Sequence, residues 1–353
     1  MDIKIGASEL RRFCENILQK IGLSQDDAFA VADSLLFCNL RGIDSHGVIR
    51  FLFYVQRLEE GGTKIKPKIS IVREKPASVL LDGDNGTGQV VGLHASRLAI
   101  DKAKKTGTCF VGVRGSSHYG AASYYSVEIT KAHMIGVSVC NGDPIMPAWG
   151  GAKRVIGNNP LSIAVPYQEG KPIVLDISMS KVAGGKVRLA AKNNQKIPKG
   201  WIIDKEGQDT EDPEDLPKGG ALLPFGEHKG YGLAFMMEIL SGALVGAGML
   251  GMIPIWFKEI KTPPNIGHCF AAIDIDGFMD LDQFKQRLDW LVQEIKSSSL
   301  SEGSRGIFIP GEPEVMVEDD RTRNGIPISE NVWQDLKELS KTYEEPLIIE
   351  SKI

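Results

Sequence analysis

Apolar residues in the first part of the chain recur every three or four positions, a spacing typical of helices with one buried face. The first two stretches follow Ser8 and Ser24, and a serine before such a run is typical of a helix N-terminus. The helices are predicted over residues 9–20, 28–40 and 51–60. We therefore expect residues 1–72 to form a helical unit.

From about residue 69 the pattern changes to short apolar runs that alternate with helical stretches. Strands are predicted over residues 69–72, 78–81, 108–113, 135–140, 161–165, 173–177 and 268–274. Helices are predicted over residues 88–105, 124–132, 230–248, 281–296 and 330–343. This alternation predicts an α/β fold for the remainder of the chain.

Composition limits the classes of partner. Of 353 residues, 42% are hydrophobic and 24% are charged, the profile of a globular protein with two or three domains. The formal net charge of −4 comes without a basic block, so we expect neither nucleic acid nor a membrane surface as partner. Five scattered cysteines favour a reducing cytoplasm over a disulfide framework. The apolar stretch at 233–255 is interrupted by Glu238 and glycines, so it predicts a buried helix and not a membrane span.

The run from Arg41 to Arg50 gathers a hydroxyl, an imidazole and a cation at the end of a predicted helix. His46 can give or take a proton near pH 7, and Arg50 can bind a carboxylate through two parallel hydrogen bonds. Ser45 adjoins the imidazole, and Tyr54 lies one helical turn beyond Arg50 on the same face. The alternative is a helix that ends at a glycine, with His46 as a surface cap.

Three predicted strands end in turns of small and polar residues, where α/β proteins commonly bind ligands. The first turn, residues 115–122, holds His118 among glycines and serines that offer little for it to pack against. The other two turns contain Gly142 and Asp143, and Asp176, Ile177 and Ser178. Together they predict one shared cleft, although each could also be a simple turn.

Two further segments are candidates for binding a ligand. Lys229 stands near the N-terminus of a predicted helix, where an anion is already favoured; a solvated cap is the alternative. Residues 310–314 predict a rigid turn whose backbone groups are open to a ligand. The sequence has no HxxxH or CxxC spacing and no GxSxG elbow, which disfavours metal catalysis and a serine hydrolase.

A glycine-rich turn at 86–92 follows an apolar run and opens a predicted helix, in the outline of a Rossmann phosphate loop. Asp82 and Asp84 lie directly before the glycines, where their charge would oppose a pyrophosphate. The next strand ends in Arg114 and not in an acidic ribose ligand. We therefore favour an ordinary turn followed by a helix N-terminus.

Seven motifs occur in order along nearly the whole chain: RGIDSHGVIR, DGDNGTGQ, GSSHYGAA, NGDP, LDIS, HKGYGL and PGEPE. Through these seven motifs taken together, the chain resembles the malate/L-lactate dehydrogenase family, which is distinct from the Rossmann-type enzymes. The resemblance implies hydride transfer between a nicotinamide cofactor and a small 2-hydroxy or 2-oxo acid. The cofactor would be NAD or NADP, with NAD favoured, and malate and oxaloacetate are the first substrates expected. The alternatives are another 2-oxoacid, ureidoglycolate or sulfolactate-type dehydrogenase, and a non-catalytic nucleotide-binding protein on the same fold.

The resemblance also implies an architecture. We expect a three-layer α/β/α fold with a mixed sheet, a non-Rossmann nicotinamide-cofactor domain, and a homodimer with each site near the subunit interface. The domains would be a helical unit of 1–72 with about 297–353, a central α/β domain of 73–118 with about 230–296, and a cofactor-binding domain of 119–229.

Roles for single residues follow from the same resemblance. Proton transfer is assigned to the residue matching His118 in some members and to the pair matching Ser45 and His46 in others. Arg50 and Tyr54 would contact the substrate. The cofactor would be lined by Gly142, Asp143, Asp176, Ile177, Ser178, Lys229, Gly311, Glu312 and Pro313.

Two departures from the family pattern bear on the ligands. Gly142 stands where some relatives carry a serine, so a hydroxyl contact to the cofactor is lost. Residues 184–187 lack a further aspartate that some imine-reducing members have, which disfavours a cyclic-imine substrate.

Overall fold

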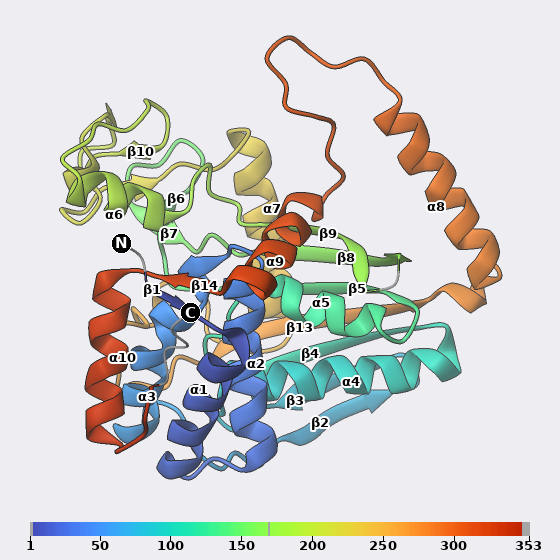
Figure 1. Cartoon of the computed structure of the whole chain (residues 1–353), viewed down its shortest axis with the longest axis horizontal. Coiled ribbons are helices and arrows are strands. Elements are labelled where there is room, and N and C mark those ends of the chain that lie inside the picture. Colours follow the sequence, from blue (N-terminus) through green and yellow to red (C-terminus); the bar gives the residue numbers. More distant parts are fainter. Residues whose placement is uncertain (1–2, 169, 348–353) are drawn as a thin grey trace.

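A seven-stranded mixed sheet forms the centre of the computed structural model, which describes residues 3–168 and 170–347 (Figure 1). In spatial order its strands are β2 (Ser70–Lys75), β3 (Ser78–Asp82), β4 (Thr108–Ser116), β13 (Ile266–Asp274), β5 (Met134–Cys140), β8 (Leu161–Gln168) and β9 (Lys171–Ile177). β3 and β4 run parallel, and every other neighbouring pair in this sheet runs antiparallel. Because a doubly wound sheet is mostly parallel, this is a non-Rossmann fold.

Helices cover both faces of the sheet. α4 (Gly88–Thr106) and α5 (Ala122–Thr130) share one hydrophobic cluster with Phe270 of β13. The neighbouring Cys269 belongs to a different cluster, with α7 (His228–Glu238), because successive strand residues point to opposite faces. The sheet joins strands of the predicted central and cofactor-binding domains; the division into three domains stays a prediction.

The predicted helix over 230–248 is too long. α7 ends at Glu238 and continues only as one π-helical turn, η4 (Ile239–Ala243). Glu238 is buried and accepts hydrogen bonds from Asn159 Nδ2 at 2.7 Å and from the backbone N–H of Leu250 at 2.8 Å. The chain therefore folds back toward the end of α7 instead of extending it.

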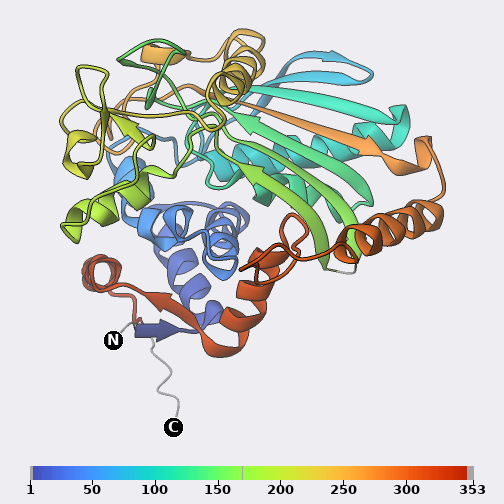
Figure 2. The same cartoon turned by 90° about the horizontal axis from the view of Figure 1, so that it is seen from above.

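The two ends of the described chain meet in a helical layer. α1 (Ala7–Ile21), α2 (Gln25–Leu40), α3 (Phe51–Glu59) and α10 (Glu330–Thr342) contribute to one hydrophobic cluster (Figure 2). β1 (Ile3–Ile5) pairs antiparallel with β14 (Ile326–Ile328) and ties these ends together. This layer carries the segment from Arg41 to Tyr54 to the edge of the sheet.

The predicted rigid turn at 310–314 is wrong beyond Gly311, because α9 (Glu312–Asn324) begins there. Gly311 has a φ of 87°, which sets the chain direction, and Pro313 lies in the first turn, where its missing N–H costs nothing. The apolar residues Val315, Met316 and Val317 of α9 are consecutive and do not recur at helical spacing, so no apolar pattern predicts this helix.

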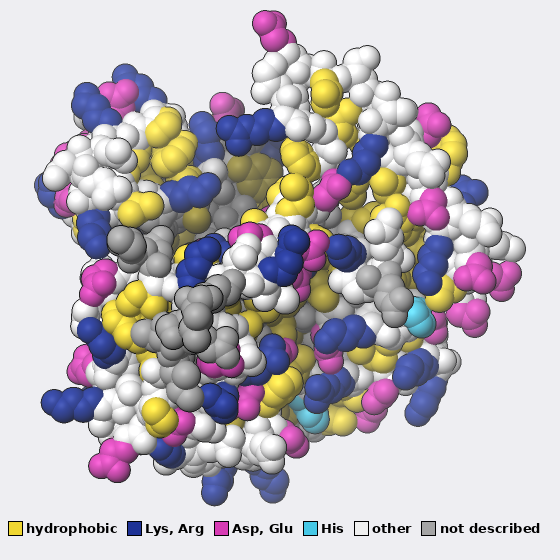
Figure 3. Space-filling model, in the orientation of Figure 1, with side chains coloured by type: hydrophobic (Ala, Val, Ile, Leu, Met, Phe, Trp, Pro, Cys, Tyr) yellow, Lys and Arg dark blue, Asp and Glu magenta, His cyan; other side chains and the backbone are white. Residues whose placement is uncertain are grey.

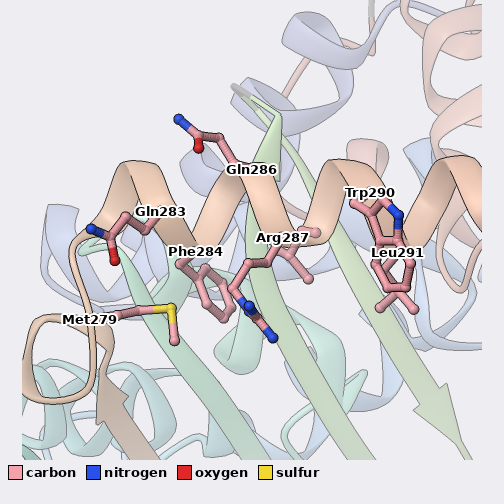
Figure 4. Close-up of a pocket in the computed structure, with 8 residues that line it drawn as sticks. Met279, Gln283, Phe284, Gln286, Arg287, Trp290 and Leu291 are labelled. Atoms are coloured by element: carbon pink, nitrogen blue, oxygen red, sulfur yellow. The ribbon is translucent and has the colours of Figure 1, made fainter.

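The remaining elements form a lobe and an arm. The lobe contains β6 (Met146–Pro147), β7 (Arg154–Ile156), α6 (Gly184–Lys192), β10 (Ile202–Ile203), β11 (Asp209–Thr210), η3 (Pro213–Asp215) and β12 (Ala221–Leu222). η5 (Leu250–Met252) and η6 (Ile275–Gly277) are single turns on either side of β13. The arm is α8 (Leu281–Lys296), whose predicted bounds are confirmed; a cavity of about 700 Å³ along it contains none of the predicted site residues (Figure 4). In the described part of the chain no helix is long and apolar enough to cross a membrane.

Candidate active site

The turn that carries Ser45 and His46 is a short 3-10 helix, η1 (Asp44–His46), held from two sides. Asn39 of α2 donates a hydrogen bond to Asp44 Oδ1 at 2.7 Å. Arg321 of α9 donates to both carboxylate oxygens of Asp44, at 2.6 and 2.9 Å. The position of the Ser45–His46 pair is therefore fixed by α2 and α9 together.

His118 lies directly against this turn, at the end of the segment that follows β4. Its ring is nearly parallel to the ring of His46, with 5.7 Å between centroids. The Tyr54 hydroxyl lies 2.6 Å from His118 Nδ1, and the backbone N–H of Gly120 points to the same nitrogen at 3.4 Å. The Gly120 N–H and the Tyr54 hydroxyl can both donate to an unprotonated Nδ1, and the hydroxyl can instead accept from a protonated Nδ1. In either tautomer Nε2 is left to meet a ligand.

Both imidazoles are neutral at pH 7. Burial, and to a lesser extent the positive charge of Arg50, lower the pKa of His46 to about 4. Burial also holds the pKa of His118 well below its usual range, with His46 and Arg50 as lesser causes. Burial raises the pKa of Tyr54, so its hydroxyl stays protonated and can donate to His118.

Arg50, in η2 (Val48–Arg50), is anchored through one edge of its guanidinium. Its Nε donates to the backbone carbonyl of Ser45 at 2.9 Å, which leaves its two terminal nitrogens for a carboxylate. Burial lowers the pKa of Arg50, and the positive charge of Arg188 lowers it as well. Tyr54 and Asp143 act in the opposite direction and raise this pKa. Among the described residues, no carboxylate forms an ion pair with Arg50.

Arg188 of α6 is a second cation at this place, and it lies in no motif that predicts a site. Its guanidinium lies over the ring of Phe257, 5.9 Å from the centroid. Burial raises the pKa of the Asp143 carboxyl, while Arg154, Arg50 and Arg188 lower it, so one acid stands among three arginines. This cluster carries excess positive charge beside the two histidines.

The glycine-rich turn at 86–92 supports the His118 segment. A Cβ added at Gly88 would lie 2.4 Å from the carbonyl oxygen of Ser117 and 2.5 Å from that of His118. Only glycine allows α4 to begin so close to this backbone. The space above Gly88, where a Rossmann loop holds a pyrophosphate, is thus filled by the protein's own carbonyl groups.

A cavity of about 580 Å³ runs from His46 to the start of α9. It is lined by six of the predicted residues: Ser45, His46, Asp176, Ser178, Gly311 and Pro313. Asp176 accepts a hydrogen bond from the backbone N–H of Ser123 at 3.1 Å and so caps α5, and burial raises its pKa to about 6. On the surface, the molecule is hollowed between the lobe and the arm, with lysine and arginine side chains near the rim (Figure 3).

The residues of this cavity fit a nicotinamide cofactor. Its volume lies within the usual range for cofactor sites. Ser123 lines it, and its buried hydroxyl lies beside the Asp176 carboxyl without a short hydrogen bond to any described group, so a ribose hydroxyl or an amide can bind both side chains. Asp176 and Ser178 add further polar groups.

Other predicted cofactor residues do not line this cavity. Lys229 is exposed near the start of α7, and Glu312 binds Lys296 at 2.5 Å and accepts from the backbone N–H of Ile309. Gly142 has no atom within 4 Å of an added Cβ, so it borders open space that a serine would partly fill. Contacts of the cofactor with Gly142, Asp143, Ile177, Lys229 and Glu312 stay predictions.

Comparison with known proteins gives one consistent result. Residues 5–337 match the family model described as malate/L-lactate dehydrogenase. The malate dehydrogenase of Pyrococcus abyssi is 41% identical over 96% of this chain and 94% of its own length. The NAD(+)-dependent ureidoglycolate dehydrogenase of Escherichia coli is 32% identical over 95% of both chains. The crystal structure of malate dehydrogenase from Entamoeba histolytica superposes with a TM-score of 0.93 at 32% identity, covering 98% of this chain and 99% of the other.

Proposed function

Because the chain belongs to the malate/L-lactate dehydrogenase family and is therefore an NAD(P)-dependent 2-hydroxyacid dehydrogenase, we propose that it interconverts malate and oxaloacetate. One observation carries the proposal: the Tyr54–His118 pair and the open side of Arg50 lie beside His46, which lines one end of the cavity. Such a group can bind a carboxylate and move one proton at the neighbouring carbon.

The proton moves through His118. Tyr54 and Gly120 hold Nδ1, so Nε2 is the atom that faces the substrate oxygen. In the reductive direction the imidazolium gives its Nε2 proton to the oxygen of oxaloacetate, which leaves a neutral ring with its proton on Nδ1 and the Tyr54 hydroxyl as acceptor. In the oxidative direction this neutral ring takes the hydroxyl proton of malate at Nε2. Hydride transfer itself is the chemistry that a bound nicotinamide supplies.

Arg50 orients the acid. Its terminal nitrogens hold the 1-carboxylate in a two-pronged contact, which fixes the adjacent carbon relative to His118. Ser45 and His46 form the wall between this cation and the cavity. The Ser45 hydroxyl lies 3.0 Å from His46 Nδ1, so this second imidazole is also held in a fixed orientation.

The second cation supports a dianionic substrate. Arg188, Arg154 and Arg50 surround Asp143, which leaves two uncompensated positive charges beside the site. Malate and oxaloacetate carry two carboxylates, whereas lactate and pyruvate carry one. Arg188 would bind the distal carboxylate, because among the described residues it has a ring contact with Phe257 and no hydrogen bond or ion pair to a protein group.

Replacement of Arg188 by glutamine should lower kcat/KM for oxaloacetate by about 10- to 100-fold, the factor expected for one hydrogen bond to a charged group. The kcat/KM for pyruvate should stay nearly unchanged, because pyruvate has no distal carboxylate. Lys186→Gln, which removes an exposed charge from the same helix, is the matched control. Equal losses for both acids in Arg188→Gln would contradict the assignment.

The charges near the cavity favour NAD over NADP. Asp176 and Glu314 place carboxyl groups at the cavity, where they can accept hydrogen bonds from ribose hydroxyls and would repel a 2′-phosphate. Arg41 also lines the cavity, but Glu318 neutralises it at 2.7 Å. The homodimer implied by the resemblance stays a prediction.

The proposed function is tested by following NADH and NADPH oxidation with oxaloacetate, sulfopyruvate, pyruvate and related 2-oxo acids, and NAD reduction with ureidoglycolate. We expect oxaloacetate with NADH to give the highest kcat/KM. A higher value for sulfopyruvate would identify the other dianionic substrate and replace malate in the proposal. Binding of cofactor without turnover of any acid would favour the non-catalytic alternative.

A further inference from the structure

Trp256 covers the imidazole of His118, although 138 residues separate them in sequence. The ring centroids of Trp256 and His118 are 4.6 Å apart, and the edge of the same indole meets Tyr54 at 5.1 Å. Its indole N–H donates to the hydroxyl of Ser117 at 3.4 Å. Trp256 therefore contacts both partners of the Tyr54–His118 hydrogen bond and the residue that precedes His118.

Arg57 holds the segment that carries Trp256. Its Nη1 donates to the carbonyls of Trp256 and Glu259, both at 3.0 Å, and its Nη2 donates to those of Gly62 and Thr262, at 3.0 and 2.7 Å. The guanidinium also lies 5.8 Å from the centroid of the Trp256 ring. Arg57 is almost fully buried and pairs with no carboxylate in the described part of the chain, so these carbonyl groups compensate its charge.

The helix α3 joins the two contacts. Tyr54 and Arg57 are three positions apart, so they lie on the same face of α3. Tyr54 is hydrogen-bonded to His118 Nδ1, and Arg57 donates a hydrogen bond to the carbonyl of Trp256. The indole of Trp256 in turn packs against the ring of His118. One helix thus sets the position of the imidazole from two sides.

We propose that Trp256, fixed by Arg57, is a positioning residue that holds the His118 imidazole in its reactive orientation and shields it from water. The inference rests on the proposed function in that it takes His118 as the proton-transferring group. Without the indole, the ring of His118 can rotate away from Tyr54, and water can reach the face that Trp256 covers. A misplacement of this kind lowers kcat more than it changes the KM for the acid, because Arg50 still binds the carboxylate.

The proposal also has a consequence for pH. The titratable groups that face His118 are Tyr54 and Arg57 on α3, His46 and Arg50 on the preceding turns, and His268 on β13. The four cationic or potentially cationic groups among them disfavour imidazolium, and burial disfavours it most. Water admitted by loss of the indole would solvate the imidazolium, so the pKa of His118 would rise.

The test compares Trp256→Ala and Trp256→Phe with the wild-type protein. Trp256→Ala should lower kcat for malate oxidation by about 10- to 100-fold. Oxidation requires neutral His118 and is lost as the pH falls through its pKa, so the acidic limb of the kcat profile should move to higher pH. Trp256→Phe keeps a ring against His118 and should restore most of kcat and the wild-type acidic limb.

NMR of histidine-labelled free protein provides a readout that does not depend on turnover. The His118 resonances should titrate at higher pH in Trp256→Ala than in Trp256→Phe, and this holds even if malate is not the substrate. Trp333→Ala removes a partly buried indole from α10 that has no ring contact with His118, Tyr54 or Trp256 in the described structure, and it controls for a general loss of stability. If Trp256→Ala does not fold, Trp256→Leu carries the same readouts. An unchanged His118 titration together with unchanged kcat, or equal effects of the alanine and phenylalanine variants, overturns the proposal.

Discussion

His118→Asn should lower kcat in both directions by about 10²- to 10⁴-fold and leave the affinity for the nicotinamide cofactor nearly unchanged. Asparagine keeps a polar group near Tyr54, but it has no nitrogen that can exchange a proton near neutral pH. The cofactor contacts proposed for Asp176, Ser178 and Ser123 do not involve His118. Steady-state rates with malate and oxaloacetate, and fluorescence titration with NADH, measure the two quantities.

The low pKa of His118 determines how kcat/KM in each direction changes with pH. Burial and neighbouring cations hold the pKa of His118 well below its usual range, so neutral imidazole dominates at pH 7. The kcat/KM for malate oxidation should therefore not fall between pH 8 and 7 through protonation of His118, whereas kcat/KM for oxaloacetate reduction should rise about tenfold for each unit of decreasing pH. The pH dependence of oxaloacetate reduction should be lost in His118→Asn.

His46→Asn is the matched variant, because His46 is the other imidazole at the cavity and is stacked on His118. We expect it to change kcat less than His118→Asn, since only the hydroxyl of Ser45 holds its ring. Normal turnover in His118→Asn together with loss of turnover in His46→Asn would assign the proton-transfer role to His46 instead of His118.

The sequence predicted the parts of the site that lie within single segments. The DSHG turn and the SSHYG turn each place a histidine at the end of an element, and the structure brings the two imidazoles together. The i, i+4 spacing of Arg50 and Tyr54 was also informative, because both face His46 and His118 from one stretch of chain. Local chemistry of this kind is readable because spacing alone determines which face a side chain occupies.

The contacts that Trp256 and Arg188 make could not be predicted from the sequence, because they depend on the order of the strands in the sheet. β13, which is late in the chain, lies between β4 and β5, and the segment before it brings Trp256 onto His118. Arg188 lies beside Phe257 for the same reason, although α6 and this segment share no motif. The start of α9 was not predicted because the few apolar residues of this helix are adjacent in sequence and form no helical period.

Arg50→Met should lower kcat/KM for oxaloacetate by about 30- to 4,000-fold, corresponding to the ~2–5 kcal/mol lost when one partner of a buried charge pair is truncated. The carboxylate would then enter a half-buried site without the two terminal nitrogens that Arg50 offers. Arg50→Lys should lose less, because it keeps the charge and loses only the two-pronged geometry. Arg73→Met, which removes a cation from the exposed strand β2, is the control.

The same variant should change the charge state of the neighbouring imidazole. Burial is the main cause of the low pKa of His46, and the positive charge of Arg50 is the second. Arg50→Met removes the second cause, so the pKa of His46 should rise above its value of about 4 while staying below that of an exposed histidine. NMR titration of the free protein measures this shift without substrate. A large loss of kcat/KM without any shift of His46 would mean that Arg50 binds the substrate from a position farther from His46, and an unchanged kcat/KM would remove Arg50 from the substrate site.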